Sequence, residues 1–103
     1  ITTPWFVYLL RFDPAVYLRK VTCPVLALNG SKDLQVPPKE NLSRIQSSIE
    51  SNGNKRVTTI ELENLNHLFQ ECNTGLPAEY ATIEQTCSPR MLEAVNTWLG
   101  KLW

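Results

Sequence analysis

The chain has 103 residues, of which 43% are hydrophobic, and ten lysines and arginines balance ten aspartates and glutamates to a formal net charge of +0. This apolar content without net charge excludes an intrinsically disordered chain, and a balanced surface offers no electrostatic footprint for nucleic acid. No apolar run approaches the ~18 residues that span a bilayer. The composition therefore predicts at most one soluble globular domain with a small-molecule or protein partner.

The first residues carry no recognisable targeting signal. The sequence begins at Ile1 and lacks the cationic start and the small-residue cleavage site of a signal peptide. We therefore expect a segment of a longer protein, and the compartment stays open between cytoplasm and periplasm.

The cysteines predict neither a disulfide framework nor a zinc site, because Cys23, Cys72 and Cys87 share no CxxC spacing. Their simplest role is that of small buried hydrophobic residues. A bridge between Cys72 and Cys87 is the alternative in an oxidising compartment, since both flank one irregular segment. One histidine with scattered carboxylates offers no metal-ligand set, so we expect no metal and no cofactor.

Two proline-initiated helices are expected at the start of the chain. Thr3 precedes Pro4 and Asp13 precedes Pro14, each an N-cap residue followed by a proline in the first helical position. These signals predict helices over residues 4–11 and 14–19, the first of them apolar nearly all round. We therefore expect residues 1–20 to form a helical segment, which either belongs to a lid over a site or connects to another part of the protein.

A strand-helix-strand unit is expected next. Residues 23–30, with a strand at 25–29, are a continuous apolar run between proline and glycine, as a buried parallel strand requires. Residues 38–51 place Leu42, Ile45 and Ile49 at helical spacing before Asn52-Gly53 ends the helix. Residues 57–62 are β-branched and predict a second strand. The fold class is therefore α/β, with two parallel strands joined by a right-handed crossover.

The remainder of the chain predicts a long loop and a final helix. Residues 64–88 have no sustained period, and long irregular segments of this kind usually have a functional reason. Ser88-Pro89 begins the final helix, which carries one broad apolar face: Met91, Val95, Trp98 and Leu102, flanked by Leu92 and Leu99. Two strands cannot cover all this apolar helix surface, so something else must complete the core.

Two residues stand where open α/β sheets place functional groups. Asp33 follows the first strand, and His67 follows the second. Either residue alone is more often an ordinary loop residue. Because parallel strands end side by side, the two loops should meet, and a carboxylate beside an imidazole is typical of nucleophile activation.

That chemistry requires a serine nucleophile, normally in a G-x-S-x-G turn that precedes both the acid and the histidine. The sequence contains no G-x-S-x-G. Ser31 lies next to the acid, in the wrong loop, and lacks the second glycine.

At these residues the chain resembles the carboxyl-terminal third of the α/β-hydrolase fold. Pro24-Val-Leu-Ala-Leu-Asn-Gly-Ser-Lys-Asp33 is similar to its seventh strand and acid loop, and Leu65-Asn-His-Leu-Phe69 to its histidine loop. The resemblance covers residues 21–103, as acid strand, crossover helix, histidine loop and final helix. Val36-Pro37 is similar to the entry of that fold's following helix. Further similarities to a bacterial esterase-like subgroup are Asp13-Pro14, Thr74-Gly75, Glu79-Tyr80, and Ser88-Pro89 leading to Trp98-Leu99.

The resemblance implies a part of a serine hydrolase that acts on a carboxylic ester or similar acyl compound. Asp33 would be the triad acid and His67 the base, while the serine and the oxyanion hole would lie upstream of Ile1. The segment alone should then be inactive. No substrate-binding residue is assigned: Glu79 and Tyr80 either line the pocket or form a solvent-facing turn.

Two other classes compete with this interpretation. One is a non-catalytic α/β-hydrolase-like domain that serves in binding or interaction, and the other is an autonomous small βαβ binding domain. If the chain is part of an α/β-hydrolase fold, the resemblance implies that strand 25–29 has lost the strand next to it and that the apolar first helix has lost its cover. Such strand edges and apolar patches recruit partners. We therefore expect a homodimer or larger assembly.

Overall fold

The structure, a computed structural model, describes residues 13–102 of the chain. The helix expected over residues 4–11 lies outside the described residues. Within them the elements follow in this order: α2 (Pro14–Leu18), β1 (Val25–Gly30), α3 (Pro38–Glu50), β2 (Val57–Leu62), the 3-10 helix η1 (Pro77–Thr82) and α4 (Pro89–Gly100).

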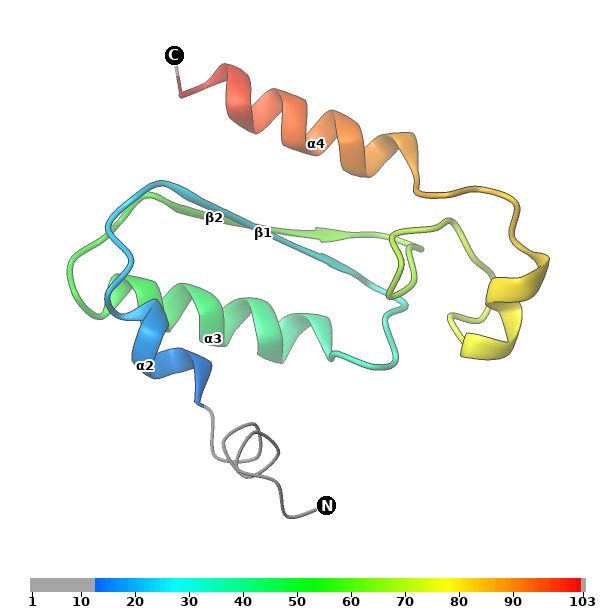
Figure 1. Ribbon diagram of the computed structural model, residues 1–103, viewed down its shortest axis with the longest axis horizontal. Helices are drawn as coiled ribbons and strands as arrows, with labels where there is room; N and C mark the ends of the chain where they lie inside the picture. Colours follow the sequence, from blue (N-terminus) through cyan, green and yellow to red (C-terminus); the bar gives the residue numbers. More distant parts are fainter. Residues whose placement is uncertain (1–12, 103) are drawn as a thin grey trace, which may run out of the picture.

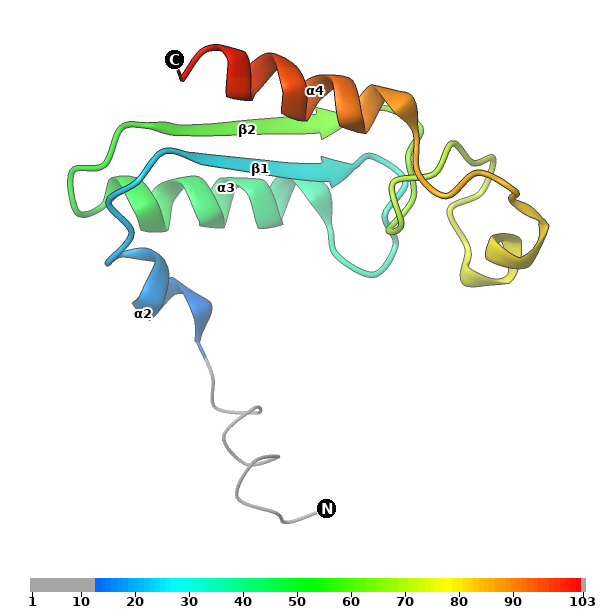
Figure 2. The same ribbon diagram turned by 45° about the horizontal axis from the view of Figure 1, so that its top comes forward.

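The centre of the fold is a parallel sheet of two strands with a helix on each face. β1 and β2 pair in register from Val25 opposite Val57 to Gly30 opposite Leu62. α3 connects the strands and lies against one face, whereas α4 lies over the other face (Figures 1 and 2). The predicted class, a small α/β fold built on a parallel crossover, is confirmed.

The crossover helix α3 follows its sequence pattern closely. Prolines at its start supply a fixed φ where no N–H bond is needed. Leu42 and Ile49 are buried and Ile45 is half-buried, so the apolar stripe faces the sheet as expected. The helix ends one residue earlier than predicted, and Gly53 beyond it adopts a φ of 89°, which glycine tolerates best.

The short helix α2 begins at the predicted proline. The Asp13 carboxylate accepts the Ala15 N–H at 3.0 Å, as an N-cap residue does. The helix ends at Leu18, one residue before the predicted end, and packs on α3.

The apolar face of α4 is only partly covered, as expected for a sheet of two strands. None of the helix residues is fully buried, and Leu92, Leu99 and Leu102 are exposed. The physical reason is the width of the sheet, because two strands present less surface than the apolar face of a 12-residue helix. Between α4 and β2 lies a cavity of about 400 Å³ lined in part by Ile60 and Trp98.

The segment after β2 is more regular than expected. Leu65 and Glu71 form an antiparallel bridge, and Pro77 opens the 3-10 helix η1 within the stretch predicted as irregular. The three cysteines are free, so the alternative of a bridge between Cys72 and Cys87 is not formed. The expected burial is wrong too, since Cys23 is exposed and the other two are half-buried.

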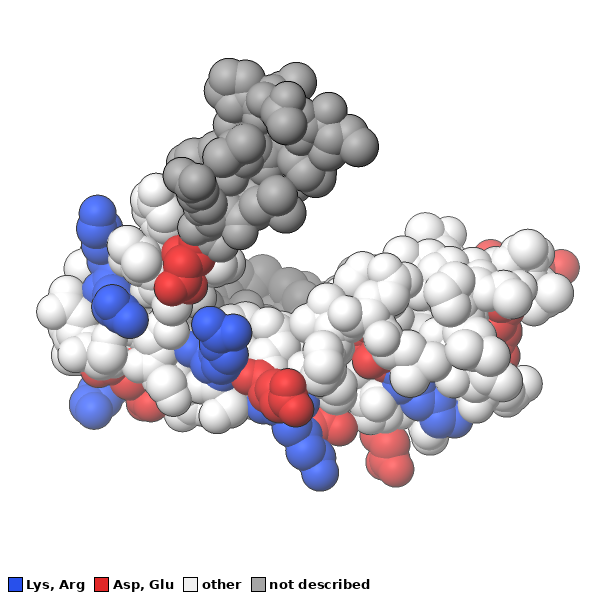
Figure 3. All heavy atoms as spheres, turned by 90° about the horizontal axis from the view of Figure 1, so that it is seen from below, with Lys and Arg blue, Asp and Glu red and all other residues white. Residues whose placement is uncertain are grey.

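The surface matches the balanced composition. On the face seen in Figure 3, acidic and basic side chains lie next to one another, with no extended area of a single sign. In the part of the chain that the structure describes, no helix is long and apolar enough to cross a bilayer.

Candidate functional site

The carboxyl ends of β1 and β2 hold two loops against each other. The Ser31 N–H donates to the Leu62 carbonyl at 2.8 Å, and the Lys32 N–H donates to the Leu65 carbonyl at 2.9 Å. The main-chain hydrogen bonds between the two strands thus continue beyond their ends. The loop after β1 and the loop after β2 therefore lie side by side at one edge of the sheet.

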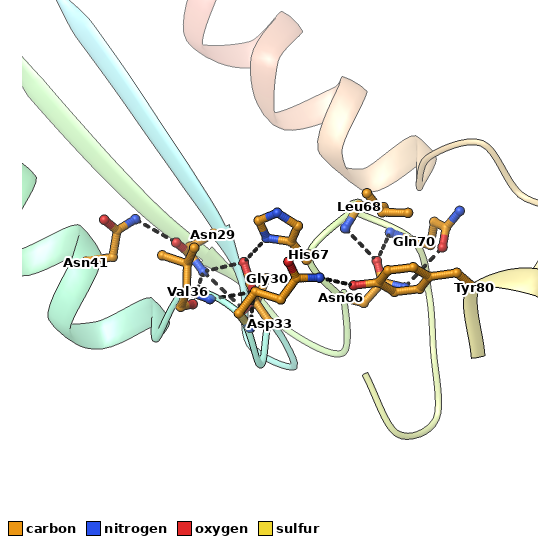
Figure 4. A network of polar contacts seen from close by, with 11 residues as sticks. Asn29, Gly30, Asp33, Val36, Asn41, Asn66, His67, Leu68, Gln70 and Tyr80 are labelled. Carbon is orange, nitrogen blue, oxygen red and sulfur yellow. Dashed lines mark hydrogen bonds and ion pairs between the residues drawn. The ribbon is translucent and has the colours of Figure 1, made fainter. Parts of the chain in front are cut away.

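Asp33 and His67, the two predicted site residues, meet at this edge. Asp33 Oδ2 lies 3.0 Å from His67 Nδ1 (Figure 4). The Asp33 side chain is 6% exposed and the His67 side chain 36% exposed. The carboxylate is thus enclosed, while the imidazole reaches the surface. The expected proximity of the two side chains is found in the structure.

The surroundings of Asp33 favour its charged form. Its Oδ1 accepts the main-chain N–H groups of Gln35 and Val36, both at 2.9 Å. Burial raises the pKa of the Asp33 carboxyl, but the hydrogen bonds from His67 and from these two amides outweigh it and hold the pKa below its ordinary value of 3.8.

The charge on Asp33 decides which nitrogen of the histidine carries the proton. An ionised carboxylate accepts hydrogen bonds and cannot donate them, so Nδ1 of the neutral ring must be the N–H donor. Nε2, on the far side of the ring from Asp33, then carries a lone pair that can accept a proton. This is the arrangement of a general base held by a carboxylate.

Asn29 and Asn41 hold the loop after β1, which carries Asp33, against the start of α3. Asn29, at the end of β1, is 4% exposed, and its amide nitrogen donates to the Val36 carbonyl at 3.2 Å. Its oxygen accepts the Asn41 amide of α3 at 2.8 Å. The first turns of α3 and the acid loop are therefore tied together. This role of Asn29 was not predicted, although a polar residue that ends an apolar strand is a usable signal.

The histidine loop is closed by its own polar groups. Asn66 is 0% exposed, and its side-chain oxygen accepts the N–H groups of Leu68 at 2.9 Å and Gln70 at 3.0 Å. Phe69 adopts a φ of 58° within this loop. Asn66 and Gln70 were also missed, because amide side chains in a loop match no motif.

Glu79 and Tyr80 hold the next segment in place. The Glu79 carboxylate accepts the N–H groups of Asn73, Thr74 and Gly75 at 2.9–3.1 Å. These hydrogen bonds, that from Asn73 first, lower the pKa of Glu79 below its ordinary value of 4.5. The Tyr80 hydroxyl accepts the Gln35 amide at 2.8 Å. Among the described residues both side chains make structural contacts, and neither hydrogen-bonds to His67.

The described residues contain no further catalytic group at the site. Within residues 13–102, Asp33 is the polar partner of the His67 ring, and nowhere in that range do three His, Cys, Asp or Glu side chains gather as they would around a metal ion. In comparisons with known proteins, no family model, no curated protein and no solved structure matches the chain.

Proposed function

We propose that this chain supplies the acid and the base of a serine-hydrolase triad, as the carboxyl-terminal part of an α/β-hydrolase fold. Asp33 is the acid and His67 the base. The substrate class is a carboxylic ester or a similar acyl compound. This assignment rests on the resemblance of residues 21–103 and on one observation, the 3.0 Å contact between Asp33 Oδ2 and His67 Nδ1.

The orientation of the imidazole ring also supports the proposal, in addition to the short distance to Asp33. A buried, ionised carboxylate fixes the ring with Nδ1–H toward Asp33, and Nε2 then lies on the opposite side of a ring that is 36% exposed. A serine hydroxyl that approaches Nε2 would lose its proton to the imidazole, and Asp33 would stabilise the imidazolium that forms. An acyl-enzyme would form on the serine, and water would then hydrolyse it, with His67 again as the base.

The nucleophile has to come from residues other than these 103, since the sequence holds no G-x-S-x-G turn. The oxyanion-hole donors would come from the same missing part. In the proposed protein, the described site therefore contributes the proton-transfer half of the reaction and depends on a second segment for the rest.

The test is fluorophosphonate labelling of the full-length gene product that contains this chain, together with hydrolysis of short p-nitrophenyl esters. We expect one labelled serine in the full-length protein and neither label nor turnover above the buffer rate in the 103-residue chain. Replacing His67 with alanine should abolish both signals, whereas Asp13→Asn, which changes the exposed N-cap residue of α2, should leave them intact.

Two results would overturn the proposal. One is a full-length protein that folds but takes no label, which would favour the alternative of a non-catalytic binding or interaction domain. The other is a labelled serine within residues 1–103, which would place the nucleophile in this chain.

A further inference from the structure

Two buried amide side chains beside His67 form a chain of hydrogen bonds. Asn66 donates from Nδ2 to Gln70 Oε1 at 3.1 Å, and Gln70 donates from Nε2 to the main-chain carbonyl of Gln85 at 2.9 Å. Asn66 is 0% and Gln70 7% exposed. We call this pair, Asn66 and Gln70, the amide clamp (Figure 4).

The orientation of both amides is fixed by main-chain groups at the two ends of the clamp. At one end, the N–H groups of Leu68 and Gln70 can only donate, so they require the oxygen of Asn66. At the other end, the Gln85 carbonyl can only accept, so it requires the nitrogen of Gln70. Flipping either amide would bring two donors or two acceptors face to face. Both positions therefore need a group that donates and accepts at once.

The amide clamp acts on the main chain of His67. The bond from Leu68 N–H to Asn66 Oδ1 closes a turn with His67 at its centre. A second bond, from Phe69 N–H to the Asn66 carbonyl at 3.0 Å, closes the same stretch from the main chain. Because His67 is held on both sides, the direction in which its side chain leaves the chain is set by its neighbours.

The clamp also joins the histidine loop to the start of α4. Gln85 bonds the clamp through its carbonyl, and the Ser88 N–H donates to the Phe69 carbonyl at 2.6 Å. The histidine loop is thus anchored to the segment before α4 as well as to the end of β2.

We propose that Asn66 and Gln70 are positioning residues for His67, which keep Nδ1 against Asp33 and Nε2 turned outward. The importance of this positioning for proton transfer rests on the proposed function. The orientation of the ring itself can be measured in the protein without any reaction. The reaction would need this orientation, because an imidazole that rotates away from Asp33 presents the wrong nitrogen to the serine.

The test uses the tautomer of the ring, read from the imidazole nitrogen signals by heteronuclear NMR. The sequence has one histidine, so the signals belong to His67. In the unchanged protein we expect the neutral ring to carry its proton on Nδ1, whereas free histidine favours Nε2. In Asn66→Asp, a carboxylate faces Gln70 Oε1, and we expect the Nδ1–H to Nε2–H ratio to fall about tenfold.

A second variant and two controls separate positioning from general loss of structure. Gln70→Met keeps the size of the side chain, removes both of its hydrogen bonds and should lower the same ratio even if Asn66→Asp does not fold. Asn96→Asp alters an exposed amide on α4, and Ile49→Ala weakens the core near the carboxyl end of α3. Neither control should change the tautomer ratio.

An unchanged ratio in Gln70→Met, or in a folded Asn66→Asp, would overturn the positioning role. So would an equal shift in Ile49→Ala, because the ratio would then follow stability alone. A wild-type ring with its proton on Nε2 would contradict the Asp33–His67 pair and with it both proposals. An Nδ1–H ring that responds to the clamp in a protein that takes no fluorophosphonate would refute the hydrolase function and leave the positioning role standing.

Discussion

The main chain of Gly30 lies directly against the carbonyl of Leu65. A β-carbon at residue 30 would stand 2.2 Å from that oxygen and 2.7 Å from the oxygen of Asn66. No side chain can yield at this contact, because both obstacles are main-chain atoms. The close approach brings the strand end that leads to Asp33 within reach of the loop that carries His67.

Gly30→Ala should therefore force the two loops apart. We expect a loss of about 3 kcal/mol in the free energy of unfolding, the upper range for overpacking, together with loss of the Asp33–His67 contact. Gly100→Ala is the matched control, since nothing lies within 4 Å of a β-carbon there, and it should be neutral or slightly stabilising. Urea unfolding of both variants measures the difference, and a fully stable Gly30→Ala protein would contradict the proposed close contact.

Asp33 should make stability depend on pH at the acid end of the range. Its folded-state pKa lies below the ordinary value of 3.8, so its stabilisation is complete above that value and is lost as the pH falls through the lower, folded-state pKa. At neutral pH, Asp33→Asn should reduce the free energy of unfolding by about 1.5–3 kcal/mol, the range for hydrogen bonds to a charged group. Urea titrations at neutral and acid pH test this, and a loss that stays constant with pH would refute it.

Glu79 should make the turn at residues 73–75 depend on pH in the same direction as Asp33, with the turn weakened at acid pH. Its lowered pKa means that its hydrogen bonds are complete above the ordinary value of 4.5 and weaken as the pH falls through the folded-state pKa. The amide proton shifts of Asn73, Thr74 and Gly75 should follow this titration. In Glu79→Gln they should not respond, whereas Glu84→Gln, an exposed change nearby, should behave as the unchanged protein does. Titration of these amides in Glu79→Gln would assign the effect to another group.

Self-association is the prediction that follows from the sheet edges. Within residues 13–102, β1 pairs with β2 alone, and its sequence, Val-Leu-Ala-Leu-Asn-Gly, carries no charge. Because an uncharged open edge accepts a further strand, we propose a homodimer or larger assembly through β1. Light scattering on the gel-filtration peak should give at least twice the chain mass of 11.7 kDa.

A pair of substitutions assigns the contact to one edge. Ala27→Lys places a charge in the middle of β1 and should return the protein to a monomer. Thr59→Lys changes the residue that stands opposite Ala27 on β2 and should leave the assembly unchanged. A monomeric wild-type protein that melts cooperatively would contradict the prediction and favour an autonomous small domain.

The local sequence predicts most of the elements because prolines and glycines mark their ends. The bounds of β2 match the prediction, and α3 differs by a single residue at Ser51. The count of two strands also predicts that the apolar face of the final helix cannot be fully covered. In the structure Met91 and Trp98 are only half-buried, whereas Leu92 and Leu99 are exposed, and the sequence pattern does not distinguish these pairs.

The Asp33–His67 pair is predictable for a topological reason, since parallel strands end at one edge. The supporting side chains are not. Asn66 owes its role to main-chain groups that lie nearby only once the chain has folded, and its sequence neighbourhood resembles that of any polar loop residue. Asn29 is marked only by being a polar residue at the end of an apolar strand, and its partners Val36 and Asn41 are not evident from the sequence. The role of Glu79 was not predictable either. A glutamate that faces solvent and one that binds the main chain of a nearby turn occur in the same kind of sequence.

The crossover between the strands also has a consequence for the order of folding. Asp33 and His67 stand 34 residues apart in the chain, and α3 and β2 lie between them. Local contacts form early, whereas closure of so long a loop costs chain entropy that only the finished sheet recovers. A partly folded chain in which α3 exists but β2 has not docked thus holds an unpaired imidazole. We therefore expect the Asp33–His67 contact to form only once β1 and β2 have paired.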